Sequence, residues 1–263
     1  MTSARGGHHG HVGPSDDLGT AVELTRPPRR VVSLVPSLTE ALAVTVPDRL
    51  VGATDWCTHP ADLDVARVRG TKNPDRAAIA ALAPDLVIAN QEENRQLDVQ
   101  RLRADGVPVW VTVIESLDQA LTSMRRLFTE ALDVGEPEWL RTATAEWAHP
   151  APEPELRVAV PIWWDPWMVV GSRTFAGDVL ARLGLRNAFA DDAERYPRVD
   201  PARLRDAGLD AVLLPDEPYA FTADDGPEAF PGVRSVLVSG RDLTWYGPSL
   251  ATARQHLQTT VRG

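Results

Sequence analysis

The feature that most constrains the fold is a regular alternation of short apolar runs with helical patterns. Val31–Val35 is a β-branched run that Pro36 ends, which predicts a buried strand followed by a turn. Ser37 and Glu40 match a capping box, with Ser37 as N-cap and Glu40 at N3, so we expect a helix near Leu38–Val44. In parallel sheets, ligands bind where strand C-termini meet helix N-termini.

The alternation continues along the chain and predicts an α/β fold with right-handed crossovers and mostly parallel sheets. No tandem short repeat is visible in the sequence. The expected strands are Leu50–Ala53, Leu86–Ala89, Val107–Val113, a run within Arg157–Trp164, Asp210–Leu214 and Ser235–Val238. The expected helices are Asp75–Leu82, Gln96–Ala104, Thr174–Leu183, Pro201–Ala207 and Pro248–Val261.

A segment without a strand pattern separates two such α/β regions. Its apolar residues Leu117, Leu121, Met124 and Phe128 fall on one helical face, and a second helix is expected over Glu138–Trp147. Two lobes joined by helices place a ligand cleft between their sheet edges. The expected parts are a disordered tail over residues 1–20, an N-terminal Rossmann-like α/β lobe over 21–115, linker helices over 116–155 and a C-terminal α/β lobe over 156–263.

Composition excludes several classes of partner. The formal net charge is -10 and no basic cluster is present, which argues against nucleic acid and anionic membranes as partners. No apolar run reaches the roughly 20 residues of a membrane-spanning helix. The first residues lack the apolar region of a signal peptide, and the single Cys57 excludes an internal disulfide. We therefore expect a cytoplasmic protein as written, and a periplasmic or extracellular one if the N-terminus is trimmed.

Histidines gather near the N-terminus. His8, His9 and His11 form a tract that could chelate a metal ion. A floppy tail with incidental histidines is the preferred interpretation.

Aromatic residues gather in loops that follow the expected strands, although only 6% of the chain is aromatic. An indole offers a flat apolar face and one N–H donor, which suits a large and partly apolar ligand. We expect about half of these residues to face the cleft and the rest to cap sheet edges. The residues are Trp56, Trp163, Trp164, Trp167, Tyr219, Trp245 and Tyr246.

An ordered set of motifs resembles the class III substrate-binding proteins, which are the cobalamin and ferric-siderophore receptors of ABC importers. The resemblance covers roughly residues 29–262, and the DWCTHP-like and TWYGP-like loops resemble the cobalamin-binding branch best. In the first half the motifs are RRVVSLVPSLTE, VGATDWCTHP, GTKNPD, LAPDLVIANQEEN and GVPVWVT. In the second half they are IWWDPWMVVGSRTFAGDVLARLGLRNAFAD, RYPRVDPARL, DAVLLPDEPY and LTWYGPSL.

The resemblance implies a non-enzymatic, bilobal binding protein with a rigid helical linker and little hinge motion. It implies a corrinoid or iron chelate as ligand, with no cofactor required, held against Pro36, Trp56, the Gln91–Asn94 turn, Trp164, Trp167 and Trp245. Together with neighbouring loop residues, the expected ligand-binding set is Pro36, Ser37, Trp56, Cys57, His59, Glu92, Glu93, Asn94, Trp164, Trp167, Tyr219, Trp245 and Tyr246.

Three features depart from the family pattern. No signal peptide precedes the first lobe, and the expected helix Glu138–Trp147 spans only about 15 Å, less than the family's backbone helix. Permease docking in the family uses an acidic residue near the start of a helix in each lobe. Asp75 fits in the first lobe, whereas Ala202 occupies the matching position in the second, with Asp200 nearby. We therefore expect a cytoplasmic relative that binds a metal chelate without serving an importer.

Two other functions remain open. Asp55, Cys57 and His59 could form a metal site or a nucleophile–base pair, which would make the protein a metal-binding enzyme or chelatase-like protein. The adjacent Glu92 and Glu93 could hold a hard metal or bond an amide, and they could equally be solvated turn residues. His59 could also ligate the metal of a bound chelate. The third interpretation is an interaction or sensor subunit whose cleft is filled by side chains.

Overall fold

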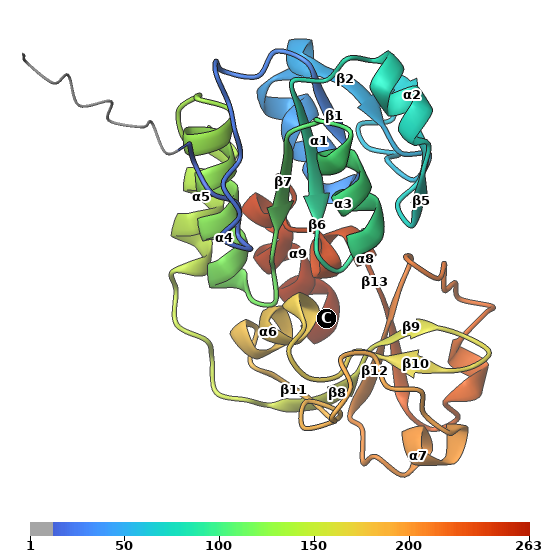
Figure 1. Ribbon diagram of the computed structural model, residues 1–263. Helices are drawn as coiled ribbons and strands as arrows, with labels where there is room; N and C mark the ends of the chain where they lie inside the picture. The colour runs from blue at the N-terminus through green and yellow to red at the C-terminus, as the bar shows by residue number, and fades with distance from the viewer. Residues whose placement is uncertain (1–12) are drawn as a thin grey trace, which may run out of the picture.

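The computed structural model describes residues 13–263, which form two α/β lobes beside a pair of helices (Figure 1). Each lobe is built on a parallel sheet, with strand order β3-β2-β1-β6-β7 in the N-terminal lobe and β11-β8-β12-β13 in the C-terminal lobe. The first sheet contains β1 (Val31–Ser33), β2 (Leu50–Ala53), β3 (Ala66–Arg67), β6 (Leu86–Asn90) and β7 (Val109–Thr112). The second contains β8 (Leu156–Ala159), β11 (Leu185–Asn187), β12 (Ala211–Pro215) and β13 (Arg234–Val238).

Two antiparallel hairpins, β4–β5 (Arg69–Gly70 and Asn73–Pro74) and β9–β10 (Pro161–Trp163 and Met168–Val169), complete the strands. The helices are α1 (Pro36–Thr45), α2 (Arg76–Ala81), α3 (Gln96–Ala104), α4 (Leu117–Arg126), α5 (Glu138–Trp147), α6 (Phe175–Arg182), α7 (Pro201–Arg205), α8 (Gly240–Thr244) and α9 (Leu250–Arg262). Short turns are η1 (Pro47–Arg49), η2 (Leu127–Ala131) and η3 (Pro227–Ala229). The predicted bilobal α/β fold with a helical linker is confirmed.

The central strands β1, β6 and β12 are buried on both faces of their sheets. Along β6, Leu86 and Ile88 pack on one side, whereas Val87 and Ala89 pack on the other against Val99 of α3. This alternation follows from the two-residue period of a strand. Fully covered parallel strands read as continuous apolar runs, which is why their positions were predictable from the sequence.

One hydrophobic cluster joins the two lobes. It includes Val31 of β1 and Ala211 of β12, which belong to different sheets, and it also contains Leu117 of α4 and Leu257 of α9. Because the inward faces of both sheets contribute to this common core, the lobes pack as one body. Residues of α1, α4, η2, α5, α6, α8 and α9 supply the helical side chains of the core.

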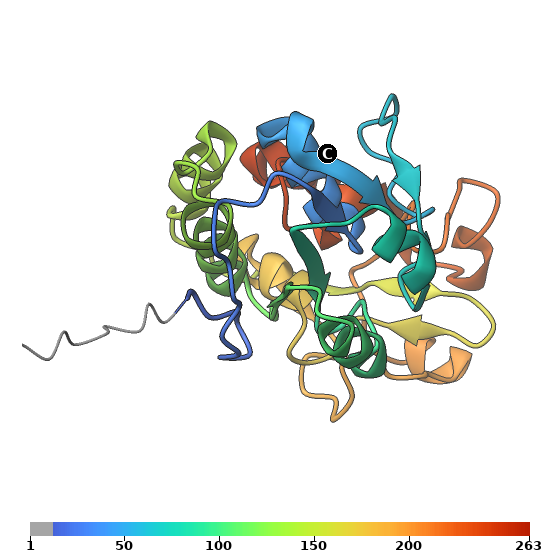
Figure 2. The same cartoon turned by 45° about the horizontal axis from the view of Figure 1, so that its top comes forward.

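The linker is a pair of packed helices. The α4 helix continues into the π-helical turn η2, and α5 lies beside α4 at one side of the molecule, as Figures 1 and 2 show. The α5 helix spans Glu138–Trp147, the range expected from the sequence. It is tied to the C-terminal helix by Trp147, whose indole N–H donates to the carbonyl of Leu250 at 2.9 Å.

The lobes share an internal repeat that the sequence did not reveal. In the N-terminal lobe, the Asp85 carboxylate accepts from the backbone N–H of Arg30, and the Arg30 side chain donates to the carbonyl of Leu82. In the C-terminal lobe, Asp210 accepts from the backbone N–H of Arg157, whose side chain donates to the carbonyl of Ala207. Equivalent strands therefore start in the same way in both lobes, although few residues are identical.

Two expectations about local structure were wrong. The capping box does not form, because Pro36 takes the first helical position and Val35 becomes the N-cap without a side-chain bond. Glu40 instead forms an ion pair with Arg241 of the other lobe.

The predicted disordered tail also differs in part from the structure. Residues 1–12, including His8, His9 and His11, lie outside the described residues. From residue 13 the chain runs along the free edge of β7 (Figure 2), where Asp16 bonds Arg103 of α3 and Asp17 bonds Arg126 of α4. Both carboxylates also accept from backbone N–H groups at the β7 edge, namely those of Val111 and Val113. Paired in this way, the edge strand is protected from pairing with another chain.

Candidate functional site

A cavity of about 850 Å³ lies between the lobes. Residues of both lobes line it, so it is the cleft expected from the two-lobed fold. The third interpretation, an interaction subunit, expected a cleft filled by side chains. The structure has an open cavity there instead. A cavity of this volume falls within the range of small-molecule sites.

The N-terminal wall is built from segments that follow strands. Pro36 and Ser37 begin α1 directly after β1, Trp56 lies in the loop after β2, and Glu92 and Glu93 lie in the turn after β6. Trp56 is 66% exposed, so most of its ring surface is free. These residues meet because the carboxyl ends of parallel strands share one edge of the sheet.

Buried amides hold the turn after β6 in place. The Asn94 side chain donates to the carbonyls of Leu34 and Thr71 at 3.2 and 2.9 Å, and its oxygen accepts from the backbone N–H of Asn90. The Asn90 oxygen in turn accepts from the backbone N–H of Glu92 at 2.8 Å. Asn94 is thus a positioning residue beneath the cavity wall and does not line the cavity itself.

The C-terminal wall is mainly apolar and aromatic. Trp163 comes from the β9–β10 hairpin and is 45% exposed, and Phe175 starts α6. Trp245 and Tyr246 follow α8, where the Tyr246 ring contacts Phe175 edge-on with centroids 5.7 Å apart. With Trp56 opposite, indoles of both lobes converge on one open cavity.

Charged groups in the cavity lining are mostly acidic. Glu92, Glu93 and Glu217 contribute three carboxyl groups, whereas Lys72 contributes one ammonium group. Arg195 of the C-terminal lobe bridges part of this charge, because it bonds Glu92 at 2.7 Å and also pairs with Glu115. This bridge ties the loop before α7 to the N-terminal lobe beside the cavity.

Burial raises the pKa of several of these groups. Desolvation raises the pKa of Glu217 to about 7, and the neighbouring Asp216 adds to the shift. Desolvation also raises the pKa of Glu93, against the opposing effect of Lys72. The Tyr196 and Tyr246 hydroxyls keep their protons at neutral pH, because burial and nearby carboxylates raise their pKa values further.

The structure brings about half of the predicted ligand-binding residues to the cavity. Trp164 and Trp167 instead pack on each other and on Phe221 within the C-terminal lobe, which covers the outer face of its sheet. Tyr219 contacts Trp163 edge-on but is absent from the lining. The predicted residues that line the cavity are Pro36, Ser37, Trp56, Glu92, Glu93, Trp245 and Tyr246.

Several lining residues were not predicted from the sequence. Lys72, Tyr196 and Glu217 carry polar groups, and Ile162 and Phe175 carry apolar surface. Lys72 and Glu217 follow strands, as the predicted residues do, and that position was the available signal. Tyr196 lies in a long loop with no periodic pattern, so nothing in the sequence placed it.

Cys57 and His59 do not form a catalytic pair. The Cys57 thiol is buried and bonds the hydroxyls of Thr39 and Thr54 at 3.0 and 3.1 Å, and burial raises its pKa. A thiol of this kind is a poor nucleophile. His59 contacts Trp245 edge-on at 5.3 Å and so supports the cavity wall from behind. Within residues 13–263, no group of three His, Cys, Asp or Glu residues is placed to hold a metal ion.

The two predicted docking residues take equivalent places in the lobes. Asp75 is the N-cap of α2 and accepts from the backbone N–H of Ala78, and Asp200 is the N-cap of α7 and accepts from Ala202. Each of these short helices precedes the strand that follows Asp85 or Asp210 in the internal repeat, namely β6 or β12. The structural equivalent of Asp75 in the second lobe is therefore Asp200, two residues before Ala202. A docking role for Asp75 and Asp200 stays a prediction.

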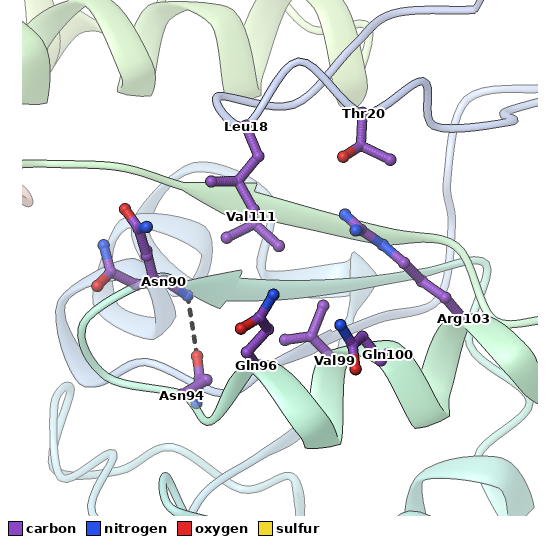
Figure 3. A pocket seen from close by; sticks show the side chains of 10 residues that line it. Leu18, Thr20, Asn90, Asn94, Gln96, Val99, Gln100, Arg103 and Val111 are labelled. Carbon is purple, nitrogen blue, oxygen red and sulfur yellow. Dashed lines mark hydrogen bonds between the residues drawn. The ribbon is translucent and has the colours of Figure 1, made fainter.

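A second, smaller pocket of about 430 Å³ lies behind the turn after β6 (Figure 3). Leu18 of the N-terminal segment and Val111 of β7 form one side, and Gln96, Gln100 and Arg103 of α3 form the other. Arg103 is already neutralised by the buried carboxylate of Asp16 at 2.6 Å. The larger interlobe cavity therefore remains the candidate site.

Comparisons with known proteins agree with this geometry. No protein-family model matches the chain. It is 26% identical over 205 residues to the vitamin B12-binding protein of Pectobacterium atrosepticum, which covers 71% of each chain. It is also 26% identical over 236 residues to the vitamin B12-binding protein of Vibrio parahaemolyticus, which covers 83% of each chain.

Solved structures agree over nearly the whole chain. The periplasmic vitamin B12-binding protein of Vibrio cholerae superposes with a TM-score of 0.72 at 20% identity, covering 90% of this chain and 97% of that one. The chain has the fold of the class III substrate-binding proteins. A periplasmic heme-binding protein from Roseiflexus sp. RS-1 shares this class III fold with a TM-score of 0.73 at 22% identity, covering 88% and 97%.

The class III resemblance inferred from the sequence motifs is thus confirmed. The similar solved structures are described as periplasmic, so the comparisons do not support the expected cytoplasmic location. They give no support to the chelatase-like alternative either. Among the described residues, no helix has the length and apolar character needed to cross a membrane.

Proposed function

We propose that the chain is a non-enzymatic binding protein that holds a vitamin B12-type or heme-type metal chelate in the interlobe cavity. The observation that carries this proposal is the convergence of Trp56, Trp163 and Trp245 from two lobes on one cavity of about 850 Å³. Flat aromatic surfaces on both walls suit a planar macrocycle, because they contact its faces and edges with little loss of side-chain entropy. Relatives that bind vitamin B12 or heme support the same ligand class.

The binding mode would involve little closure of the lobes. The common core and the helix pair hold the walls at a fixed separation, so the cavity is largely formed before the ligand arrives. Preorganisation of this kind saves ordering entropy on binding. We expect the backbone of the ligand-bound protein to match that of the free protein closely.

Titration of intrinsic tryptophan fluorescence with cyanocobalamin and with hemin tests the proposal. Trp56→Ala, Trp163→Ala and Trp245→Ala should each weaken binding about tenfold, because each removes an aromatic face from the cavity. Trp139→Phe is the matched control, since Trp139 packs on Phe128 and bonds Thr45 outside the cavity. Unchanged affinity in all three cavity variants, or saturation by neither ligand, would contradict the proposal.

We further propose that the protein works outside the cytoplasmic membrane with an ABC permease. Support comes from the periplasmic relatives and from the equivalent positions of Asp75 and Asp200 in the two lobes. Asp75→Lys and Asp200→Lys together should abolish stimulation of permease ATPase activity while ligand affinity stays within about twofold. Asp98→Lys on α3 is a control of the same charge change. Equal stimulation by the double variant and the control would contradict this partner assignment.

A further inference from the structure

The interlobe cavity contains more carboxyl groups than it can neutralise with its own cations. Glu217 and Glu93 lie on opposite walls, one in each lobe, and Glu92 lies beside Glu93. Of the cations near them, Arg195 is engaged by Glu92 and Glu115, and Arg241 is engaged by Glu40. Lys72 donates to the backbone carbonyl of Glu92, which leaves its charge shared among the carboxylates of this turn.

Glu217 is placed to bond a ligand. It follows β12, and its backbone packs so closely on Gly240 that a Cβ there would lie 2.7 Å from the Glu217 carbonyl oxygen. The missing Cβ at Gly240 thus leaves room for the Glu217 side chain, which lines the cavity together with Trp245. The Oε1 atom of Glu217 is buried and has no hydrogen-bond partner among the described residues. A buried acceptor without a partner costs free energy that a ligand donor would recover.

We propose that these carboxyl groups select a ligand whose rim carries neutral N–H donors and reject one whose rim carries carboxylates. This inference rests on the proposed binding function and narrows its ligand class. The corrin of vitamin B12 carries its peripheral carboxyl groups as amides, which donate hydrogen bonds to carboxylate oxygens. Heme carries two propionate carboxylates, which the excess of carboxyl groups over free cations in the lining would repel.

The charge balance around each group sets how selection depends on pH. Burial is the main cause that raises the pKa of Glu217 to about 7; Asp216 and Glu40 add to the shift, whereas Trp245 and Arg241 oppose it. Glu93 faces Lys72 and Glu92. Above pH 7 Glu217 is therefore ionised and repels anions, and below pH 7 its proton removes that repulsion.

The test compares two corrinoids that share a ring and differ in rim charge. Dicyanocobinamide carries amides, and dicyanocobyrinic acid carries free carboxyl groups in their place. At pH 8 the unmodified protein should bind the amide form at least tenfold more tightly, since one like charge inside a cavity weakens binding by about that factor. Hemin, a natural dicarboxylate, is the third probe and should bind as weakly as dicyanocobyrinic acid.

Two variants separate charge from hydrogen bonding. Glu217→Gln keeps an acceptor oxygen, so affinity for dicyanocobinamide should change less than threefold while affinity for dicyanocobyrinic acid rises about tenfold at pH 8. Glu217→Leu removes the acceptor, so affinity for dicyanocobinamide should fall about fivefold or more. Between pH 8 and pH 6, binding of the carboxylate corrinoid should strengthen in the unmodified protein and stay level in Glu217→Gln.

Each outcome has one interpretation. Equal or tighter binding of dicyanocobyrinic acid or hemin at pH 8 overturns the inference while leaving the proposed function intact. Unchanged affinity for dicyanocobyrinic acid in the double variant Glu217→Gln/Glu93→Gln overturns the inference as well. If no probe binds, the proposed function itself fails, and circular dichroism of each variant confirms that the fold was present in the assay.

Discussion

Glu40 of α1 and Arg241 of α8 form an ion pair that joins the two lobes through a buried carboxylate. The Glu40 side chain is 6% exposed and accepts two hydrogen bonds from the Arg241 guanidinium group, one from Nε at 3.2 Å and one from Nη2. Close to this pair, Gly247 packs on the first turn of α1, where a Cβ would lie 2.9 Å from the carbonyl oxygen of Ser37. The contact between the lobes is therefore tight and specific next to the cavity.

Removing either partner of this pair should have unequal effects. Arg241→Ala leaves the Glu40 charge buried without a partner, so we expect a loss of about 3 kcal/mol in the free energy of unfolding. Glu40→Gln removes the buried charge and should cost about 1 kcal/mol. Urea unfolding at pH 7 measures both, and the double variant Glu40→Gln/Arg241→Ala should lose less than the sum of the two. Equal losses in the two single variants would show that the pair is solvated.

Arg254 of α9 should be among the residues most sensitive to substitution. It is 6% exposed and donates to the carbonyls of Glu146, His149 and Pro150, which close the C-terminal end of α5. Arg254→Met would leave these carbonyls without charged donors, at a cost of about 3 kcal/mol. Arg254→Lys keeps the charge but lacks the planar guanidinium group with its several donors. Thermal denaturation should therefore place its stability between that of the unmodified protein and that of Arg254→Met.

The thiol of Cys57 should be nearly unreactive in the folded protein. It lies buried between Thr39 and Thr54, and burial raises its pKa, so little thiolate forms at neutral pH. Labelling with a disulfide reagent at pH 8 should be at least a hundredfold slower in buffer than in 8 M urea. Fast labelling in buffer would mean that the DWCTHP loop opens freely.

Glu217 should make the free protein less stable as pH rises from about 4.5 to about 7. Its carboxyl group has a pKa of about 7 when folded and an ordinary lower value when unfolded, so the folded state binds more protons in this range. The penalty is complete above pH 7 and absent below about pH 4. Glu217→Gln should therefore gain about 1 kcal/mol over the unmodified protein at pH 8, after allowance for solvent screening, and nothing at pH 4.

Urea midpoints at the two pH values give this difference directly. Glu228→Gln on the turn η3 offers a control, because Glu228 lies outside the cavity. A Glu217→Gln gain that is equal at both pH values would rule out titration as its source.

Most secondary structure could be predicted because its physical signals are local. The strand Leu50–Ala53 and the helices Gln96–Ala104 and Glu138–Trp147 have the predicted bounds, since apolar runs and helical periodicity mark them directly. The short strand β11 and the one-turn helix α8 carry too few residues for a periodic signal. The capping box failed because the helix starts two residues early, with Pro36 in its first turn and Val35 as N-cap.

The site was less predictable than the fold. Loop position correctly suggested Trp56 and Trp245, because such loops meet at the sheet edge. Trp164 and Trp167 lie in the connection between β9 and β10, directly after Trp163, yet they pack on each other and on the outer cluster of the C-terminal lobe. Glu217 depends on its packing against Gly240 in a distant segment, which no local pattern encodes.

The hydrophobic cluster shared by both sheets has a consequence for what the protein can admit. Side chains such as Leu117 and Leu257 pack between the lobes, so they set the width of the interlobe cavity. We therefore expect the cavity to accept only molecules that already match this width. A substitution that changes the size of one such leucine should therefore alter which ligands fit the cavity, although the leucine contacts no ligand.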